Sequence, residues 1–138
     1  MGSGKTSLAN ALCLFIKPGN TIATVEDIPE FNLPIPKMYW LRLIEREAET
    51  IGGAGEISLF RLLKFALRSN VDYVLVNEIR GEEAKVWIQA ISVGHGGITT
   101  IHAFDVDNMR IRLRNLGISE ADLYSLYAVV LMSAIPID

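Results

Sequence analysis

A glycine-rich tract near the start of the sequence leads directly into a lysine and two hydroxyl-bearing residues. In order, these residues are Gly2, Ser3, Gly4, Lys5, Thr6 and Ser7. The order matches the second half of the G-x-x-x-x-G-K-[ST] loop, in which backbone N–H groups surround phosphates at the start of a helix. The lysine ammonium would bind the outer phosphates, and the threonine hydroxyl would bind Mg²⁺. The tract therefore predicts a site for a nucleotide with Mg²⁺.

Two glutamates follow runs of residues that favour β-strands. Glu26 comes after residues 21–25, and Glu78 comes shortly after the apolar residues 73–76. A carboxylate at such a strand end can hold Mg²⁺-bound water or take a proton from an attacking water. We expect Glu78 to act through Mg²⁺ or as the base, and Glu26 to reach the same water. A solvated glutamate in a loop is the alternative for each.

Two histidines bracket a glycine- and threonine-rich segment, residues 96–101. His102 is expected at the end of a strand, on the same side of the sheet as Glu78. An imidazole there can hydrogen-bond a terminal phosphate and respond to its loss. A structural histidine is the alternative, and for His95 the functional and structural interpretations carry equal weight.

Helices and strands are expected to alternate along the chain. The hydrophobic spacing predicts helices over residues 5–15, 58–70, 82–93 and 105–116, and strands over residues 21–25, 38–44, 73–76, 98–101 and 128–135. The apolar run 73–76 does not alternate with polar residues, which is typical of a strand covered on both faces in a parallel sheet. The order predicts an α/β sandwich around a mostly parallel sheet, folded as one domain over residues 1–138.

Polar residues mark several helix starts. Ser58 is an expected N-cap, as is either Asp105 or Asp107, and Ser119 with Asp122 resembles a capping box. These signals place helix starts after residues 58, 105 or 107, and 119.

Composition narrows the class of protein. The 138 residues carry a net charge of −3, so bulk electrostatics do not favour nucleic acid as a partner. The longest apolar stretch, residues 126–137, is too short to span a bilayer, and no apolar leader is present, which favours a cytoplasmic location. The single cysteine, Cys13, fits a reducing compartment and is expected to be buried rather than reactive.

Four stretches, taken in chain order, resemble a known family. Residues 2–6, 24–30, 76–84 and 94–103 are similar to the Walker A loop, Asp box, Walker B segment and His box of the type II/IV secretion system ATPases. The archaeal branch that assembles pili and archaella is the most similar. The resemblance extends from residue 2 to about residue 135. One departure is Asn77, where family members usually have glycine.

The resemblance implies a RecA-like, three-layer fold whose first strand and N-terminal domain precede Met1, so the chain is interpreted as N-terminally truncated. It also implies a homo-hexamer that uses ATP and Mg²⁺ to drive assembly or export at the inner face of the cytoplasmic membrane, with a polytopic membrane platform protein as partner. Within the site, it implies that Lys5 and Thr6 bind nucleotide and Mg²⁺. Glu26 would polarise the lytic water, Glu78 would act through Mg²⁺ or as the base, and His102 would contact the γ-phosphate.

Other interpretations remain open at this point. One is a catalytically inactive fragment that acts only in subunit contacts, and another is a RecA-like DNA motor. The acidic stretch 26–30 and the segment around His102 argue against the DNA motor. For residues 1–3 alone, a flexible chain start is a further alternative to a phosphate loop.

Overall fold

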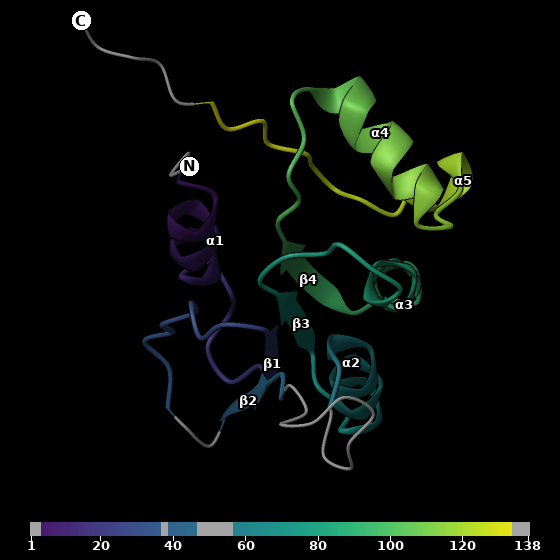
Figure 1. Cartoon of the computed structure of the whole chain (residues 1–138). Helices are drawn as coiled ribbons and strands as arrows, with labels where there is room; N and C mark the ends of the chain where they lie inside the picture. The colour runs from purple at the N-terminus through teal and green to yellow at the C-terminus, as the bar shows by residue number, and fades with distance from the viewer. Residues whose placement is uncertain (1–3, 37–38, 47–56, 134–138) are drawn as a thin grey trace, which may run out of the picture.

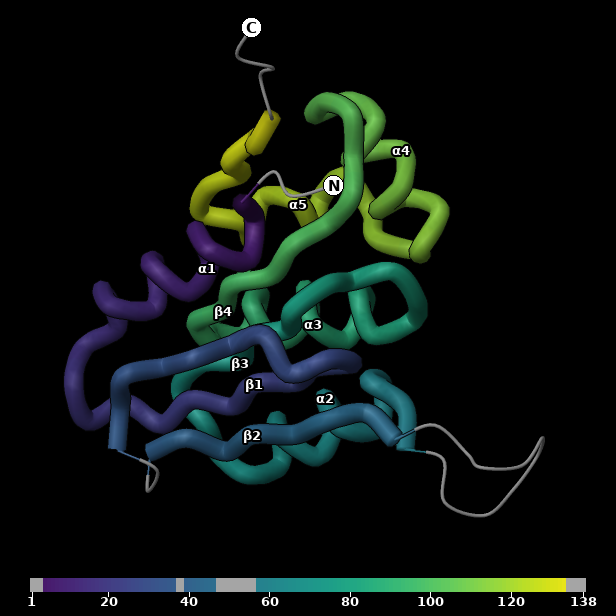
Figure 2. The backbone as a smooth tube through the Cα atoms, turned by 60° about the vertical axis from the view of Figure 1, so that its left-hand side comes forward, coloured from purple at the N-terminus to yellow at the C-terminus, as the bar shows by residue number. Residues whose placement is uncertain are grey.

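The computed structural model describes residues 4–36, 39–46 and 57–133 of the chain. In order, its elements are α1 (Lys5–Cys13), β1 (Ile22–Glu26), β2 (Trp40–Ile44), α2 (Leu59–Arg68), β3 (Tyr73–Val76), α3 (Glu83–Ser92), β4 (Gly96–Thr99), α4 (Val106–Asn115) and α5 (Glu120–Leu123). The four strands form one parallel sheet in the order β2-β1-β3-β4, which Figure 2 shows as a stack. Helix α1 lies on one side of this sheet, and α2 and α3 lie on the other (Figure 1). The predicted α/β class with a parallel sheet is confirmed.

The two central strands divide their side chains between two apolar layers. Successive residues of a strand point to opposite faces. Ala23 and Val25 pack in the core on the side of α2 and α3, whereas Ile22 packs with Leu75 on the side of α1. Because both faces are covered, residues 22–26 are all buried, as the non-alternating sequence of a parallel strand requires.

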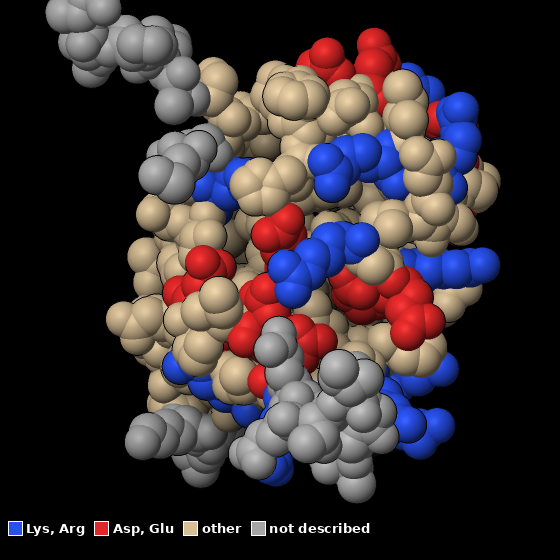
Figure 3. Space-filling view, in the orientation of Figure 1, with Lys and Arg blue, Asp and Glu red and all other residues tan. Residues whose placement is uncertain are grey.

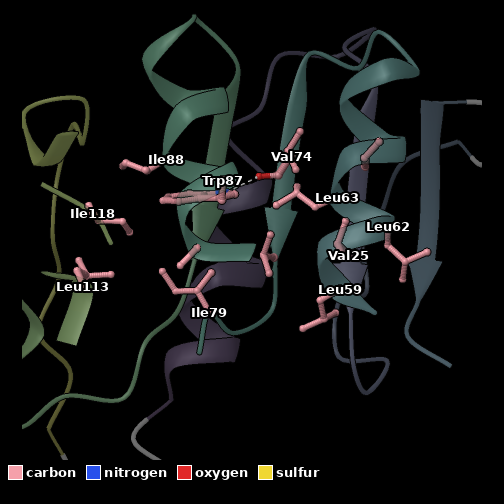
Figure 4. Packing of buried hydrophobic residues seen from close by; sticks show 14 of the residues in the cluster. Val25, Leu59, Leu62, Leu63, Val74, Ile79, Trp87, Ile88, Leu113 and Ile118 are labelled. Carbon is pink, nitrogen blue, oxygen red and sulfur yellow. Dashed lines mark hydrogen bonds between the residues drawn. The ribbon is translucent and has the colours of Figure 1, made fainter. Parts of the chain in front are cut away.

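The larger apolar core joins the sheet to α2, α3 and α4 (Figure 4). Trp87 of α3 lies at its centre and is 5% exposed. Its indole N–H donates to the carbonyl of Val74 at 3.1 Å, so the one polar atom of this buried ring is paired. Burial of side chains of this kind provides the main driving force for folding.

The smaller core lies between α1 and the sheet. It consists of Ala9, Cys13, Ile22, Phe31, Leu33 and Leu75. Burial raises the pKa of the Cys13 thiol to about 11, and its Sγ lies 3.1 Å from the Ala9 carbonyl, to which it donates. A thiol of this kind is almost fully protonated near neutral pH and therefore a poor nucleophile, so the prediction of a buried, unreactive cysteine is confirmed.

Strand β4 begins and ends two residues earlier than expected. Its first two residues are Gly96 and Gly97, although glycine usually weakens a strand. The two glycines fit here because neighbouring side chains fill the space that a Cβ would occupy. A Cβ on Gly96 would lie 2.3 Å from the ring of Tyr73, and a Cβ on Gly97 would lie 2.4 Å from Ile91. His102 therefore lies in the segment after the strand, not at its last residue.

The expected strand over residues 128–135 is wrong for residues 128–133, which form neither strand nor helix, and residues 134–135 lie outside the described part of the chain. This segment runs past the upper end of α1 instead of joining the sheet (Figures 1 and 2). Its side chains at Val129, Val130 and Leu131 are exposed. Apolar content alone does not make a strand without a neighbour to pair with.

Most helix starts follow the polar signals. Asp105 caps α4 by accepting from the N–H of Asn108 at 2.7 Å, and Ser119 forms the expected capping box with Asp122. Ser58, in contrast, makes no side-chain cap to α2. The carboxylate of Glu45 accepts from the N–H of Leu59 at 3.0 Å instead, because β2 delivers it to the start of that helix.

Candidate functional site

The start of α1 has the geometry of an anion-binding helix end. Gly4 precedes the helix with φ of 79°, a left-handed conformation that favours glycine, and no side chain caps the helix. The first-turn N–H groups and the positive end of the helix dipole together suit a phosphate. Thr6 and the exposed Ser7 belong to this first turn. Gly2 and Ser3, also predicted to bind nucleotide, lie outside the described residues.

Three of the predicted site residues come together at this helix end. The Nζ of Lys5 lies 3.3 Å from Nδ1 of His102. On the other side of the imidazole, Nε2 lies 3.7 Å from Oε1 of Glu78. The strands deliver these groups together because the carboxyl ends of β3 and β4 lie at the same edge of a parallel sheet. The structure thus places Lys5, His102 and Glu78 in one row.

Glu26, predicted to polarise the lytic water, lies beneath the surface of this site. Its side chain is fully buried, on the face of β1 that is turned toward α1. One oxygen accepts from the backbone N–H groups of Glu30 and Phe31 at 2.7 and 2.8 Å. The other accepts from the Thr24 hydroxyl and from Nε of Arg42, both at 3.0 Å. A carboxylate with this many donors anchors the loop that follows β1 and has little capacity left for a water molecule.

Glu30 is the carboxylate of this loop that faces the helix end. Its Oε2 accepts from the Thr6 hydroxyl at 3.4 Å. Asn10 of α1 fixes the approach, because its amide donates to the carbonyls of Thr6 and Glu30 at 3.1 and 3.2 Å and its oxygen accepts from the N–H of Asn32 at 2.8 Å. Sequence reasoning missed both Glu30 and Asn10. The alternation of side chains along β1 was a signal in the sequence that Glu26 would be buried, because it places Glu26 on the same face of the strand as Ile22.

Asn77 and Asp27 connect the ends of β3 and β1. The Asn77 amide donates to Oδ1 of Asp27 at 2.5 Å, and Nη2 of Arg80 lies 2.9 Å from Oδ2. Partial burial raises the pKa of Asp27, but the hydrogen bonds from Asn77 and Ile28 and the charge of Arg80 outweigh it and hold the pKa below its ordinary value. Asp27 is therefore a carboxylate over the physiological range of pH.

His95 lies at the opposite end of the sheet from this site. It immediately precedes β4, and its Nδ1 lies 2.9 Å from the carbonyl of Val71, just before β3. A histidine that bridges the starts of two parallel strands cannot reach residues at their carboxyl ends. The structural interpretation of His95 therefore holds.

A cavity of about 230 Å³ opens beside Lys5. The segment after β4, the first turns of α4 and residues 129–132 line it, mostly with apolar side chains. Acidic side chains gather on the face shown in Figure 3, over the sheet, with basic side chains among them. The site therefore combines cationic, anionic and apolar groups within one region.

Among the described residues, no helix has the length and apolar character that a membrane span requires.

The described residues fit a nucleotide with Mg²⁺. Lys5 and the uncapped helix end supply donors for phosphate oxygens, and Thr6 and Glu78 supply oxygen atoms of the kind that Mg²⁺ prefers. Carboxylates beside a phosphate site would repel the phosphates without a cation between them. The donor set therefore matches a metal–nucleotide pair better than a free anion.

Two solved structures share this fold. The VirB11 ATPase from the Brucella suis type IV secretion system, solved with sulphate, matches with a TM-score of 0.71 and 32% identity over 84% of this chain and 33% of that protein chain. The ATPase DotB of Legionella pneumophila matches with a TM-score of 0.62 over 90% of this chain and 34% of that protein chain. At 22% identity, the likeness to DotB shows the fold alone. The predicted RecA-like fold is confirmed.

Curated relatives come from archaea and bacteria. The uncharacterized protein MJ1287 of Methanocaldococcus jannaschii is 45% identical over 104 residues, which are 75% of this chain and 37% of that protein. The type IV secretion system protein PtlH of Bordetella pertussis is 41% identical over 113 residues, which are 81% of this chain and 33% of PtlH. The chain thus spans about a third of the length of these relatives. The family model described as "Type II/IV secretion system protein" matches residues 1–135. With nearly its whole length matched, the chain belongs to the type II/IV secretion system protein family.

Proposed function

We propose that this chain is the nucleotide-binding part of an ATP-hydrolysing motor subunit that powers pilus or archaellum assembly, or protein secretion, at the cytoplasmic membrane. The observation that carries the proposal is the row formed by Lys5, His102 and Glu78. In it, Nζ of Lys5 lies 3.3 Å from Nδ1 of His102, and Nε2 of His102 lies 3.7 Å from Oε1 of Glu78. These residues come from the three motifs that the resemblance assigns to phosphate binding, phosphate sensing and metal or base chemistry. The VirB11 structure, which is 32% identical to this chain, is that of an ATPase.

In the proposed site, Lys5 and the first turn of α1 bind the phosphates. The hydroxyl of Thr6 and the carboxylate of Glu78 hold Mg²⁺, which would neutralise the charge that builds up on the phosphates during transfer. The role proposed for His102 is contact with the terminal phosphate, and the contact of its imidazole with Lys5 supports this role.

The base that takes the proton of the attacking water is assigned to an acidic residue of the 26–30 stretch. From the sequence, Glu26 is predicted to polarise the lytic water, and Glu78 to act through Mg²⁺ or as the base. The geometry favours Glu30, because its carboxylate is exposed beside Thr6 while Glu26 is buried beneath the loop. Glu26 then supports catalysis by holding the backbone of Glu30 in place. Glu78 serves through the metal or as a second base.

From the resemblance we further propose that the whole protein forms a homo-hexamer at the inner face of the membrane. The hexamer binds a polytopic platform protein and has no nucleic acid as partner. The hexamer and the platform protein are properties proposed for the whole protein, of which this chain is about a third by comparison with its relatives.

The test is Mg²⁺-dependent ATP hydrolysis by the protein as its gene encodes it, including any residues encoded upstream. Hydrolysis that Lys5→Ala removes, and that the matched control Lys17→Ala leaves intact, supports the proposal. Lys17 is exposed and lies beyond the end of α1. Binding of nucleotide without hydrolysis would instead favour the inactive, subunit-binding alternative. Stimulation by single-stranded DNA would favour the DNA motor.

A further inference from the structure

Asn77 joins the carboxyl ends of three neighbouring strands. The residue follows β3 directly and is 4% exposed. Its backbone N–H donates to the carbonyl of Val25 in β1 at 3.2 Å. Its carbonyl accepts from the hydroxyl of Thr100, just after β4, at 2.6 Å. The backbone of Asn77 is therefore fixed at the edge of the sheet where the candidate site lies.

The side chain of Asn77 turns toward the loop that follows β1. Its amide nitrogen donates to Oδ1 of Asp27 at 2.5 Å and to the carbonyl of Ile28 at 3.5 Å. Its oxygen accepts from the backbone N–H of Asp27 at 3.4 Å. A primary amide carries both a donor and an acceptor, so Asn77 can bond the backbone and the side chain of Asp27 together.

Arg80 holds the second oxygen of Asp27, with Nη2 2.9 Å from Oδ2. The backbone around Arg80 is itself fixed, because the N–H groups of Arg80 and Gly81 donate to Oε1 of Glu83 at 2.7 and 2.8 Å. Glu83 is 5% exposed at the start of α3. Asp27 is thus held from two sides by Asn77 and Arg80, which flank Glu78 in sequence. We call Asp27, Asn77 and Arg80 the Asp27 clamp.

We propose that Asn77 is a positioning residue, which fixes the loop of residues 27–31 against the segment that carries Glu78 and so places Glu30 beside Thr6. Besides Asn10 of α1, which bonds the backbone of Glu30 and Asn32, two groups anchor the loop among the described residues. Glu26 holds its second half at the N–H groups of residues 30 and 31, whereas the Asp27 clamp holds its first half at residues 27 and 28. Without Asn77, the side chain from outside the loop that still bonds Asp27, among the described residues, is that of Arg80, which is 55% exposed.

Amide hydrogen exchange tests the anchoring without nucleotide. In Asn77→Gly, the amides of Ile28, Glu30 and Phe31 should exchange at least about tenfold faster, because a hydrogen bond to a charged group is lost. Exchange within β1 and β3 should stay as in the parent. The control is Asn70→Gly, at an exposed residue with φ of 53° that accepts glycine. Unchanged exchange in the loop, or equally faster exchange throughout the sheet, overturns the proposal.

Kinetics connect the clamp to the proposed function on which this role for Glu30 rests. Asn77→Gly should lower kcat about tenfold and change the KM for ATP by less than about threefold, since a displaced base affects the chemical step more than binding. Parent-like kcat in a variant whose loop exchange has risen overturns the placement of Glu30. A parent protein without ATPase activity counts against the proposed function alone, and the exchange measurement still decides the clamp.

Discussion

The Nζ of Lys5 lies 3.3 Å from Nδ1 of His102, although 97 residues separate them in the sequence. On the other side of the ring, Nε2 of His102 lies 3.7 Å from Oε1 of Glu78. The imidazole thus lies between a cation that suits phosphate and a carboxylate that suits Mg²⁺. Loss of a terminal phosphate near Lys5 would change the contacts of His102. The segment that leads into α4 begins directly after His102, so such a change could reach that helix.

Removal of the lysine should abolish nucleotide binding. Lys5→Ala deletes the one side-chain cation that the structure places at the start of α1 among the described residues of this site. Titration with a fluorescent ATP analogue in the presence of Mg²⁺ measures the effect. Lys17→Ala should bind like the parent. Equal affinity in both variants would mean that the phosphates bind elsewhere.

The two glutamates of the 26–30 stretch should respond in opposite ways to loss of charge. Glu30→Gln should keep the fold and nucleotide binding and slow hydrolysis by about 10²- to 10⁴-fold, the range for losing an acid–base group. Glu26→Gln should lower the free energy of unfolding by about 1–3 kcal/mol, because it weakens buried hydrogen bonds to a charged acceptor. Urea unfolding and steady-state hydrolysis of both variants provide the comparison. A stable Glu26→Gln protein that has lost hydrolysis would return to Glu26 the role of polarising the lytic water.

His102→Ala should separate binding from turnover. ATP affinity should stay within about tenfold of the parent, because one hydrogen bond to a charged group is lost while other phosphate contacts remain. Hydrolysis, or its stimulation by the membrane partner, should fall much further. His95→Ala is the matched histidine control, and it should affect stability but leave the hydrolysis rate of the folded protein unchanged. Parent-like turnover in His102→Ala would make His102 a structural residue.

Asp27 should make stability depend on pH in the acid range. Its folded-state pKa lies below the ordinary value of 3.8, so the folded protein binds fewer protons at this group than the unfolded chain does. The stabilisation is therefore fully present above about pH 4 and is lost as the pH falls through the lower folded-state pKa. Urea unfolding at several pH values, for the parent and for Asp27→Asn, measures it. The difference between the two proteins should shrink with acidification, and a constant difference would contradict the assigned pKa direction.

The sequence by itself determined the features of this protein that depend on residues close together in the chain. A glycine followed by lysine and threonine at the start of an apolar helix predicts a phosphate site, because the helix end and its positive dipole belong to one continuous segment. The apolar runs before Glu26 and Glu78 identified the buried parallel strands. The caps at Asp105 and Ser119 were also readable, since they join residues only three positions apart.

The tertiary structure decided what depends on contacts between distant segments. Glu26 and Glu30 are both acidic residues in one short stretch, and only the packing of α1 and Arg42 against β1 buries the first and turns the second toward Thr6. The glycines of β4 became strand residues because the Tyr73 ring and Ile91 fill the space of their missing side chains. Residues 128–133 remained irregular despite their apolar sequence, because a strand exists only where a neighbouring strand accepts its hydrogen bonds.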